Sequence, residues 1–365
     1  MTGDEANSAL IALFAREGYP RVEPPVLQPA DAFVDLSGED IRRRMFVTQD
    51  ASGRELCLRP EYTIPVCREH LAKGAEGPGA YGYCGPVFRL RTGETGEFLQ
   101  AGIESIGRPD AAAADAEILA IALDGLASLG LGDVRVQLGD MGLLNALTDA
   151  LGLAPAAKRR VIRSIVSGRG LPPAAEPEGP DEHAGLLAAI EGQAPQAAKA
   201  FVEDILSIAG IARVGGRSAG EIAERFLARA ANRSGMSEEA RGLLERYLAI
   251  QGDPDAAAAA IRSLAREAGL DLGPALGELE DRIGFMAARG LDVASFAFTA
   301  TFARNLDYYT GFIFEVQDPR RGDGRPVVGG GRYDRLLQHL GAPGPIPAVG
   351  CSFWLDRIQQ GNQPR

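Results

Sequence analysis

The chain has 365 residues, which is enough for two domains or for one large domain that carries an insertion. Its 38 Lys and Arg against 49 Asp and Glu give a formal net charge of −11. This balance disfavours a large RNA-docking face, because phosphate contacts need clustered cations, but it does not exclude a local basic site. The four cysteines show no Cys-x-x-Cys spacing and the three histidines are far apart, so we expect no metal.

We also expect a cytoplasmic protein that binds no membrane. The N-terminus lacks the basic and apolar regions of an export signal, and no apolar run approaches the length of a membrane span. Scattered single cysteines without an export signal are typical of a reducing compartment.

The first 142 residues alternate between strand and helix patterns. The prolines in residues 21–27 forbid a helix there, and Asp50-Ala-Ser-Gly-Arg54 is typical of a hairpin turn. The expected elements are a helix over 4–18, an extended segment over 21–27, a hairpin of 45–48 with 55–59, a helix over 64–71, strands over 81–91 and 98–106, a helix over 110–129 and a strand over 134–138.

The strand over 98–106 has one polar face. With a two-residue period, Phe98, Gln100, Gly102 and Glu104 share that face, while the apolar residues between them take the other. A carboxylate and an amide on one face of an apolar strand indicate a polar ligand, and a solvated sheet face is the equal alternative.

Residues 143–288 change character, because helical patterns there are separated by Pro and Gly breaks. Ser218-Ala-Gly-Glu221 is typical of a capping box, and Ser237 is placed to cap another helix. We expect an all-helical insertion without chemistry of its own, with strands resuming near Ala294.

The segment 303–315 follows one apolar run, Phe296–Phe302, and leads into another, Phe312–Val316, and both runs predict strands. Between these runs the chain carries Arg304, Asp307, Tyr308 and Tyr309. A charged and hydroxylated cluster between buried strands is costly unless it binds something, so a ligand site is one interpretation. A hairpin whose tyrosines are core or rim residues is the other.

The C-terminal part contains three consecutive glycines followed by Arg332-Tyr-Asp334. The bare backbone favours tight strand packing or a ligand lying against it, and the spacing fits neither a P-loop nor a dinucleotide fingerprint. Residues 347–358 predict a strand that leads into a helix beginning near Ser352.

Taken together, five stretches resemble the catalytic domain of class II histidyl-tRNA synthetase. They are Leu58-Arg-Pro-Glu61, Gly85-Pro-Val-Phe-Arg89, Phe98–Glu104, Arg304-Asn-Leu-Asp-Tyr-Tyr309 and Gly329-Gly-Gly-Arg-Tyr-Asp334, and they occur in the family's order. The resemblance implies an α+β fold with a class II aminoacyl-tRNA synthetase-like antiparallel sheet flanked by helices. Residues 1–142 and 289–365 would form that core, 143–288 the helical insertion, and we expect no C-terminal anticodon-binding domain.

The same resemblance implies a histidine pocket. Glu61 and Thr63, with help from Gln100, would take the ammonium group, and Arg304 and Gln100 would face the carboxylate. Glu104 and Tyr309 would hold the imidazole. The implied histidine-binding set is Glu61, Thr63, Gln100, Glu104, Arg304, Tyr308 and Tyr309, and each offers a group that histidine needs.

Departures from the synthetase pattern lie on the ATP side. The loop over 92–97 is short and carries Glu94 and Glu97, which would repel phosphate. Trp354 stands where the family has a small glycine, and Tyr62 also replaces a glycine. Arg89 and Arg357 resemble ATP-contacting arginines, so we expect a vestigial ATP site of Arg89, Trp354 and Arg357 and no catalytic residues.

A histidine pocket without tRNA machinery resembles the regulatory subunits of ATP phosphoribosyltransferase, which are synthetase paralogues. This resemblance implies a non-catalytic subunit needed for the first step of histidine biosynthesis and for feedback regulation by L-histidine. It implies a homodimer within a hetero-oligomer with the short-form catalytic subunit, with no tRNA and no cofactor. Two alternatives stay open: a truncated histidyl-tRNA synthetase-like enzyme that activates histidine with ATP, and a free-standing histidine sensor.

Overall fold

The computed structural model describes residues 3–34, 42–74, 77–90, 93, 95–172, 213–214, 217–218, 236–303 and 308–361. The chain divides into two compact units. The larger unit joins Met1–Ala146 with Arg246–Arg365, and the smaller one is Leu147–Glu245. Within the described ranges, no helix is both long and apolar enough to cross a bilayer.

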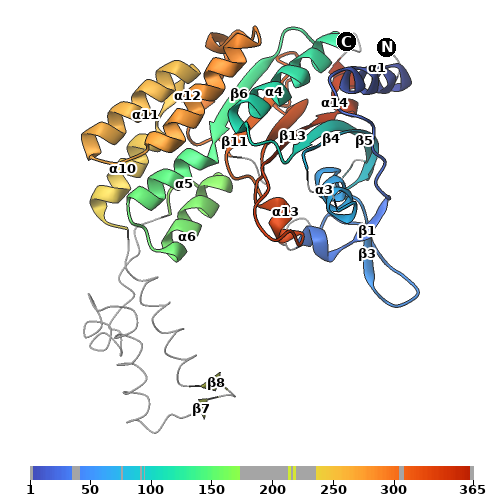
Figure 1. The fold of residues 1–365 in the computed structure, drawn as a ribbon, viewed down its shortest axis with the longest axis horizontal. Helices are drawn as coiled ribbons and strands as arrows, with labels where there is room; N and C mark the ends of the chain where they lie inside the picture. Colours follow the sequence, from blue (N-terminus) through green and yellow to red (C-terminus); the bar gives the residue numbers. More distant parts are fainter. Residues whose placement is uncertain are drawn as a thin grey trace. The chain divides into compact units, whose positions relative to one another are not determined.

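An eight-stranded sheet forms the centre of the larger unit (Figure 1). In spatial order its strands are β4 (Gly79–Phe88), β5 (Glu97–Ile106), β13 (Ala348–Trp354), β12 (Val328–Arg332), β11 (Phe312–Gln317), β6 (Arg135–Asp140), β10 (Ala297–Thr299) and β9 (Gln251–Gly252). Neighbouring strands run antiparallel, except that β6 and β10 are parallel. The expected α+β fold with a largely antiparallel sheet is confirmed.

A second, three-stranded sheet contains the predicted hairpin. Its order is β1 (Leu27–Pro29), β3 (Glu55–Leu58) and β2 (Val47–Gln49), all antiparallel. The turn between β2 and β3 closes because the Asp50 carboxylate accepts hydrogen bonds from the Ser52 and Arg54 amides at 2.8 and 3.0 Å. Gly53 supplies the positive φ of 82° that this turn requires.

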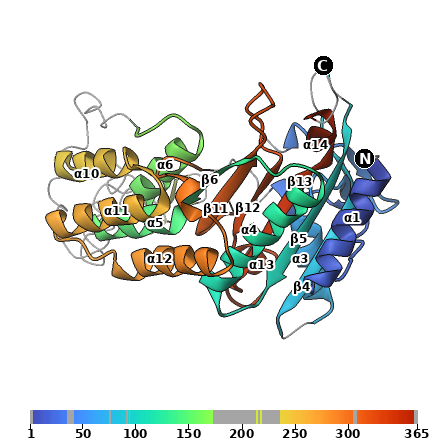
Figure 2. The same ribbon diagram turned by 90° about the horizontal axis from the view of Figure 1, so that it is seen from above.

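Helices lie on both faces of the large sheet. On one face, α4 (Ala111–Ser128) lies against β12 and β13, with α1 (Gly3–Arg16) and α12 (Gly273–Ala288) beside it (Figure 2). On the other face, α3 (Thr63–Ala72) contacts β5 and α13 (Leu336–His339). The remaining elements of this unit include α11 (Pro254–Ala268), the 3₁₀ turn η1 (Val293–Ser295) and α14 (Leu355–Gly361).

The hairpin interpretation of the segment around residues 303–315 is wrong. Strands β10 and β11 do not pair with each other, because β6 lies between them and pairs with both. The Tyr308–Tyr309 pair therefore lies on a crossing from one side of β6 to the other, and not in a tight turn.

The limits of the smaller unit differ from the expected insertion of 143–288. Residues 246–288 cluster with the sheet unit, because α12 packs on α4. The smaller unit holds α6 (Pro155–Val166) and a short strand pair, β7 (Arg213–Val214) and β8 (Arg217–Ser218), so its described part is not purely helical. Helices α5 (Met141–Ala150) and α10 (Glu238–Leu248) cross its limits.

Three local predictions concern helix starts. Ser237 caps α10, since its Oγ accepts a hydrogen bond from the Ala240 amide at 3.1 Å. The predicted capping box starts at Ser218, which lies in β8, and the rest of it falls outside the described residues. The last helix, α14, begins at Leu355 and not near Ser352, because β13 stays paired with β5 through Trp354.

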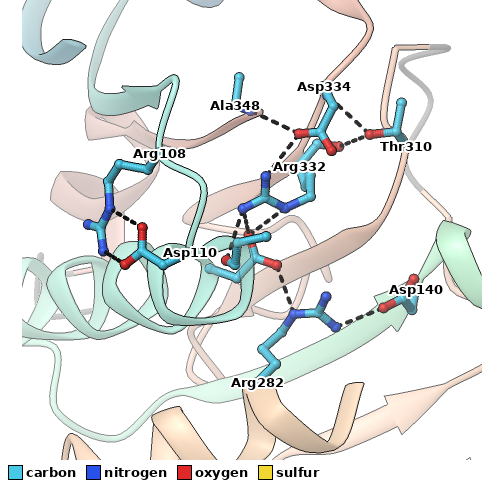
Figure 3. Close-up of polar contacts among 10 residues, drawn as sticks. Arg108, Asp110, Asp140, Arg282, Thr310, Arg332, Asp334 and Ala348 are labelled. Carbon is cyan, nitrogen blue, oxygen red and sulfur yellow. Dashed lines mark hydrogen bonds and ion pairs between the residues drawn. The ribbon is translucent and has the colours of Figure 1, made fainter. Parts of the chain in front are cut away.

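A buried ion-pair network joins the helices to the sheet (Figure 3). The Asp115 carboxylate on α4 accepts hydrogen bonds from Arg332 Nη2 on β12 at 2.6 Å and from Arg282 Nε on α12 at 2.8 Å. Arg282 Nη1 also donates to Asp140 Oδ2, at the end of β6, at 2.8 Å. The Asp115 side chain is fully buried, so water cannot replace these contacts.

We expect Asp115→Asn to lower the free energy of unfolding by about 3–5 kcal/mol, because two buried guanidinium groups lose their shared charge partner. Asp124→Asn, at an exposed position of the same helix, is the matched control and should change it by less than about 0.5 kcal/mol. Urea denaturation followed by circular dichroism measures both. Equal stability of the two variants would contradict this role.

Candidate functional site

Glu104 on β5 is surrounded by hydroxyl groups. Its carboxylate accepts hydrogen bonds from Thr63 Oγ1 at 2.8 Å, from the Tyr83 hydroxyl at 3.2 Å and from the Tyr333 hydroxyl. Burial raises the pKa of Glu104 to about 8, although the three hydroxyl groups act in the opposite direction. The group is therefore a carboxyl in a buried polar cluster. We call the residues Thr63, Tyr83, Glu104 and Tyr333 the Glu104 cluster.

Glu61 joins this cluster through the start of α3. Its two carboxylate oxygens accept hydrogen bonds from the Thr63 amide at 2.6 Å and the Ile64 amide at 2.9 Å. These amides belong to the first turn of the helix and have no partner within it. Burial raises the pKa of Glu61. The carboxylate thus fixes the helix end that presents the Thr63 hydroxyl to Glu104.

Glycines on the neighbouring strands make room for these groups. Gly350 lies opposite Glu104 in the ladder of β5 and β13, and a Cβ built there would lie 1.7 Å from Glu104 Oε2. A Cβ at Gly102 would lie 2.4 Å from the Tyr83 hydroxyl oxygen. Gly330 packs tightly against the backbone of Gly350 instead. The glycine-rich strands therefore serve close packing and also leave space for polar side chains.

The two tyrosines of the crossing segment reach the same cluster. The Tyr308 ring lies 5.8 Å from the Tyr333 ring in a T-shaped arrangement and 5.0 Å from the Tyr309 ring, between centroids. Thr310 holds this segment beside β12, since its amide donates to the Arg332 carbonyl at 2.8 Å. Arg304, the predicted partner of the histidine carboxylate, lies outside the described residues.

Gln100 shares the face of Glu104 on β5 and stands opposite Gly85 of β4 and Trp354 of β13. Its side chain is 2% exposed, and Oε1 has no hydrogen-bond partner in the part of the chain that the structure describes. A buried amide oxygen without a donor is costly, so this atom is a candidate acceptor for a hydrogen-bond donor of a ligand.

An aromatic layer covers the sheet beside Gln100. Tyr62 stacks on Tyr83, with ring centroids 4.4 Å apart, and Arg59 Nη2 donates to the Tyr62 hydroxyl at 2.5 Å. Trp354 and Phe98 belong to the same buried cluster. The Tyr62 ring is therefore part of the buried core beside Gln100.

The two arginines of the predicted ATP side hold backbone carbonyls. Arg89 Nε donates to the Pro60 carbonyl at 2.6 Å, and Arg357 Nη1 donates to the Pro326 carbonyl at 2.5 Å. The Arg357 guanidinium also lies 4.5 Å from the Trp354 ring centroid. Among the described residues, no group of three or more His, Cys, Asp or Glu side chains is arranged to hold a metal.

Sequence reasoning placed Glu61, Thr63 and Glu104 together but missed three hydroxyl groups. Tyr83 and Tyr333 donate to Glu104, and Ser352 Oγ lies 2.8 Å from the Tyr83 hydroxyl. The two-residue period of the adjacent strand could have identified Tyr83, because it lies opposite Gly102. Ser352 follows from the pairing of β13 with β5, which no local pattern reveals.

Known proteins resemble the chain over nearly its whole length. The family model described as histidyl-tRNA synthetase matches residues 3–192 and 220–358. Proteins named ATP phosphoribosyltransferase regulatory subunit from Brucella canis and Brucella suis are each 41% identical to it, over 97% of this chain and 96% of theirs.

Solved structures share the fold. An ATP phosphoribosyltransferase regulatory subunit/histidyl-tRNA synthetase from Bacillus halodurans C superposes with a TM-score of 0.70 at 23% identity, covering 100% of this chain and 79% of that one. A histidyl-tRNA synthetase from Nostoc sp. PCC 7120 gives 0.65 at 16% identity, covering 98% and 70%.

We expect stability to fall as the pH rises from about 4.5 to about 8, because Glu104 keeps its proton in the folded protein over that range and loses it when unfolded. The stabilisation by this proton is fully present below about pH 4.5 and is lost above about pH 8. Between these values the free energy of unfolding falls by up to about 1.4 kcal/mol per pH unit. Glu104→Gln should remove this slope. Unfolding free energies measured at half-unit pH steps test it, and parallel curves for the two proteins would contradict it.

Proposed function

The chain belongs to the family of ATP phosphoribosyltransferase regulatory subunits, whose members share the histidyl-tRNA synthetase fold, and we propose that it is a non-catalytic subunit that binds L-histidine. It would act with a short-form catalytic subunit in the first step of histidine biosynthesis and confer feedback inhibition on it. We further propose a homodimer within the hetero-oligomer, with no role for tRNA.

The observation that carries the histidine proposal is the buried polar face of β5 and α3. Free histidine brings an ammonium, a carboxylate and an imidazole, which need acceptors, a cation and hydrogen-bonding groups respectively. Glu61, Gln100 and Glu104 offer acceptors on one side of the sheet, and of these three groups Gln100 has an oxygen, Oε1, without a hydrogen-bond partner among the described residues. Arg304 would supply the cation, and Tyr308 and Tyr309 would complete the ring site.

A regulatory role is supported by the aromatic side chains that lie where the synthetase resemblance predicts the ATP site. The Tyr62–Tyr83 stack and Trp354 occupy the sheet next to Gln100 with buried aromatic rings. Arg89 and Arg357 direct donors to backbone carbonyls, a structural use of groups that would otherwise meet phosphate. An adenine ring would have to displace part of this layer.

Feedback requires a coupling free energy between the histidine site and the partner's active site. Histidine must bind the inhibited arrangement more tightly than the active one, since equal affinity would shift nothing.

A histidine-activating enzyme is the second candidate. It is favoured by the position of Arg89 and Arg357, whose guanidinium groups lie over the rings of Phe98 and Trp354. Trp354 stands opposite Gln100 in the sheet. Histidine-dependent exchange of pyrophosphate into ATP by the purified protein would support this candidate and overturn the non-catalytic proposal.

Reconstitution tests the leading proposal directly. The protein is mixed with the short catalytic subunit from the same organism, and phosphoribosyl transfer to ATP is measured with and without histidine. Stimulation by the protein and inhibition by histidine are the expected results. No stimulation at any subunit ratio would refute the proposal.

We expect Gln100→Leu to separate ligand binding from stability. Removing the unpaired buried oxygen should leave the unliganded protein as stable or more stable, since no hydrogen bond is lost. Histidine affinity should fall by about tenfold or more, because the ligand loses an acceptor of about 1–3 kcal/mol. Calorimetry with histidine and thermal melts measure both. Unchanged affinity would remove Gln100 from the site.

A further inference from the structure

Helix α6 (Pro155–Val166), in the smaller unit, has an apolar face and an opposite face that carries exposed arginines. Its buried residues, Ala157, Val161 and Ile165, recur every four positions and form one apolar face of the helix. The side chains of Arg159, Arg160 and Arg163 are exposed, and the exposed Arg169 follows the helix end. The apolar face is already covered, so only the charged face is available to another molecule.

This face is a basic patch on an acidic protein. Residues 150–175 contain Lys158, Arg159, Arg160, Arg163 and Arg169 and no Asp or Glu. These five taken from the 38 Lys and Arg leave 33 against 49 Asp and Glu, a formal charge of −16 for the rest of the chain. A cluster of positive charge on a chain of net negative charge attracts acidic groups locally.

Within the described residues, the central pair of these charges has no ion-pair partner. Lys158 Nζ pairs with Asp149 at 2.6 Å, and Arg169 Nε donates to Ser167 Oγ at 3.1 Å. Arg159 and Arg163 are four residues apart, on one side of the helix, and no carboxylate of the described residues lies within ion-pair distance of either. Two neighbouring cations of like charge disfavour the helix slightly, which indicates a use outside it.

We propose that the arginine face of α6, centred on Arg159 and Arg163, docks an acidic surface of a partner protein. The proposal rests on the function proposed above, and the partner is the catalytic subunit. The net negative charge of the rest of the chain repels an acidic partner while this patch attracts it, so the patch would favour encounters at this helix. A nucleic acid fits less well, because the formal net charge of −11 disfavours a polyanion that needs many phosphate contacts.

Charge reversal tests the proposal. The double variant Arg159→Glu with Arg163→Glu is compared with the wild type for association with the short catalytic subunit, by surface plasmon resonance at 50 and 300 mM salt. The wild type should associate faster at low salt, because surface charges are screened beyond about 10 Å at 0.1 M ionic strength. The double variant should associate about tenfold or more slowly at 50 mM salt and lose most of the salt dependence.

Arg266→Glu is the matched control, since it reverses an exposed arginine of α11 in the larger unit. It should leave the association rate within about twofold, and all three proteins should keep the same melting temperature and histidine affinity. An unchanged double variant would overturn the docking surface while leaving the regulatory function in place. An equal loss in Arg266→Glu would overturn it too, because total charge and not the patch would then matter.

Two further outcomes are decisive. If the wild type does not associate with the catalytic subunit at all, both this proposal and the proposed function fail. If the double variant keeps its association with that subunit but loses binding of a transfer RNA probe that the wild type binds, the patch serves nucleic acid and the protein-docking proposal is overturned.

Discussion

The carboxylate of Asp115, held between two arginines, is the interaction on which the larger unit depends. One buried anion receives Arg332 from β12 and Arg282 from α12, so α4 is bound to the sheet and to its neighbouring helix at one point. Desolvating these groups is expensive, and the expense is offset only while all partners stay in place. The network therefore specifies one arrangement of helices and sheet, because any slippage leaves a buried charge unpaired.

The same strand end carries the network on one side and the Glu104 cluster on the other. Arg332 points to α4, and the next residue, Tyr333, donates its hydroxyl to Glu104. Asp334 closes the segment, since its carboxylate accepts hydrogen bonds from Arg332 Nη1 at 2.9 Å and from the Ala348 amide at 2.8 Å (Figure 3). A change in the position of Tyr333 would thus act on both faces of the sheet, which connects the candidate site to the helices that cover it.

Local patterns predicted much of this arrangement, and non-local pairing limited the rest. The two-residue period of β5 was enough to place Gln100 and Glu104 on one face, and the hairpin of β2 and β3 followed from its turn residues. The end of the smaller unit at residue 245 could not be predicted from local patterns. The residues that follow it belong to the larger unit, where Arg282 bonds Asp115, which lies 167 positions earlier in the chain. The hairpin alternative for residues 303–315 failed for the same reason, since β6, which separates β10 from β11, lies far earlier in the sequence.

Under the proposed function, the hydroxyl groups that bond Glu104 would distinguish a sensor from a rigid binding site. Three hydroxyl groups bond its carboxyl, two at Oε1 and one at Oε2, so an imidazole that takes one of these three acceptor positions would exchange with the hydroxyl that holds it. Such an exchange gains little from the new hydrogen bond alone, because one bond replaces another. It does release Thr63, Tyr83 or Tyr333, and these belong to α3, β4 and the end of β12 respectively. Histidine binding would therefore depend on the position of one of these elements. Feedback requires that histidine bind one arrangement of that element more tightly than another.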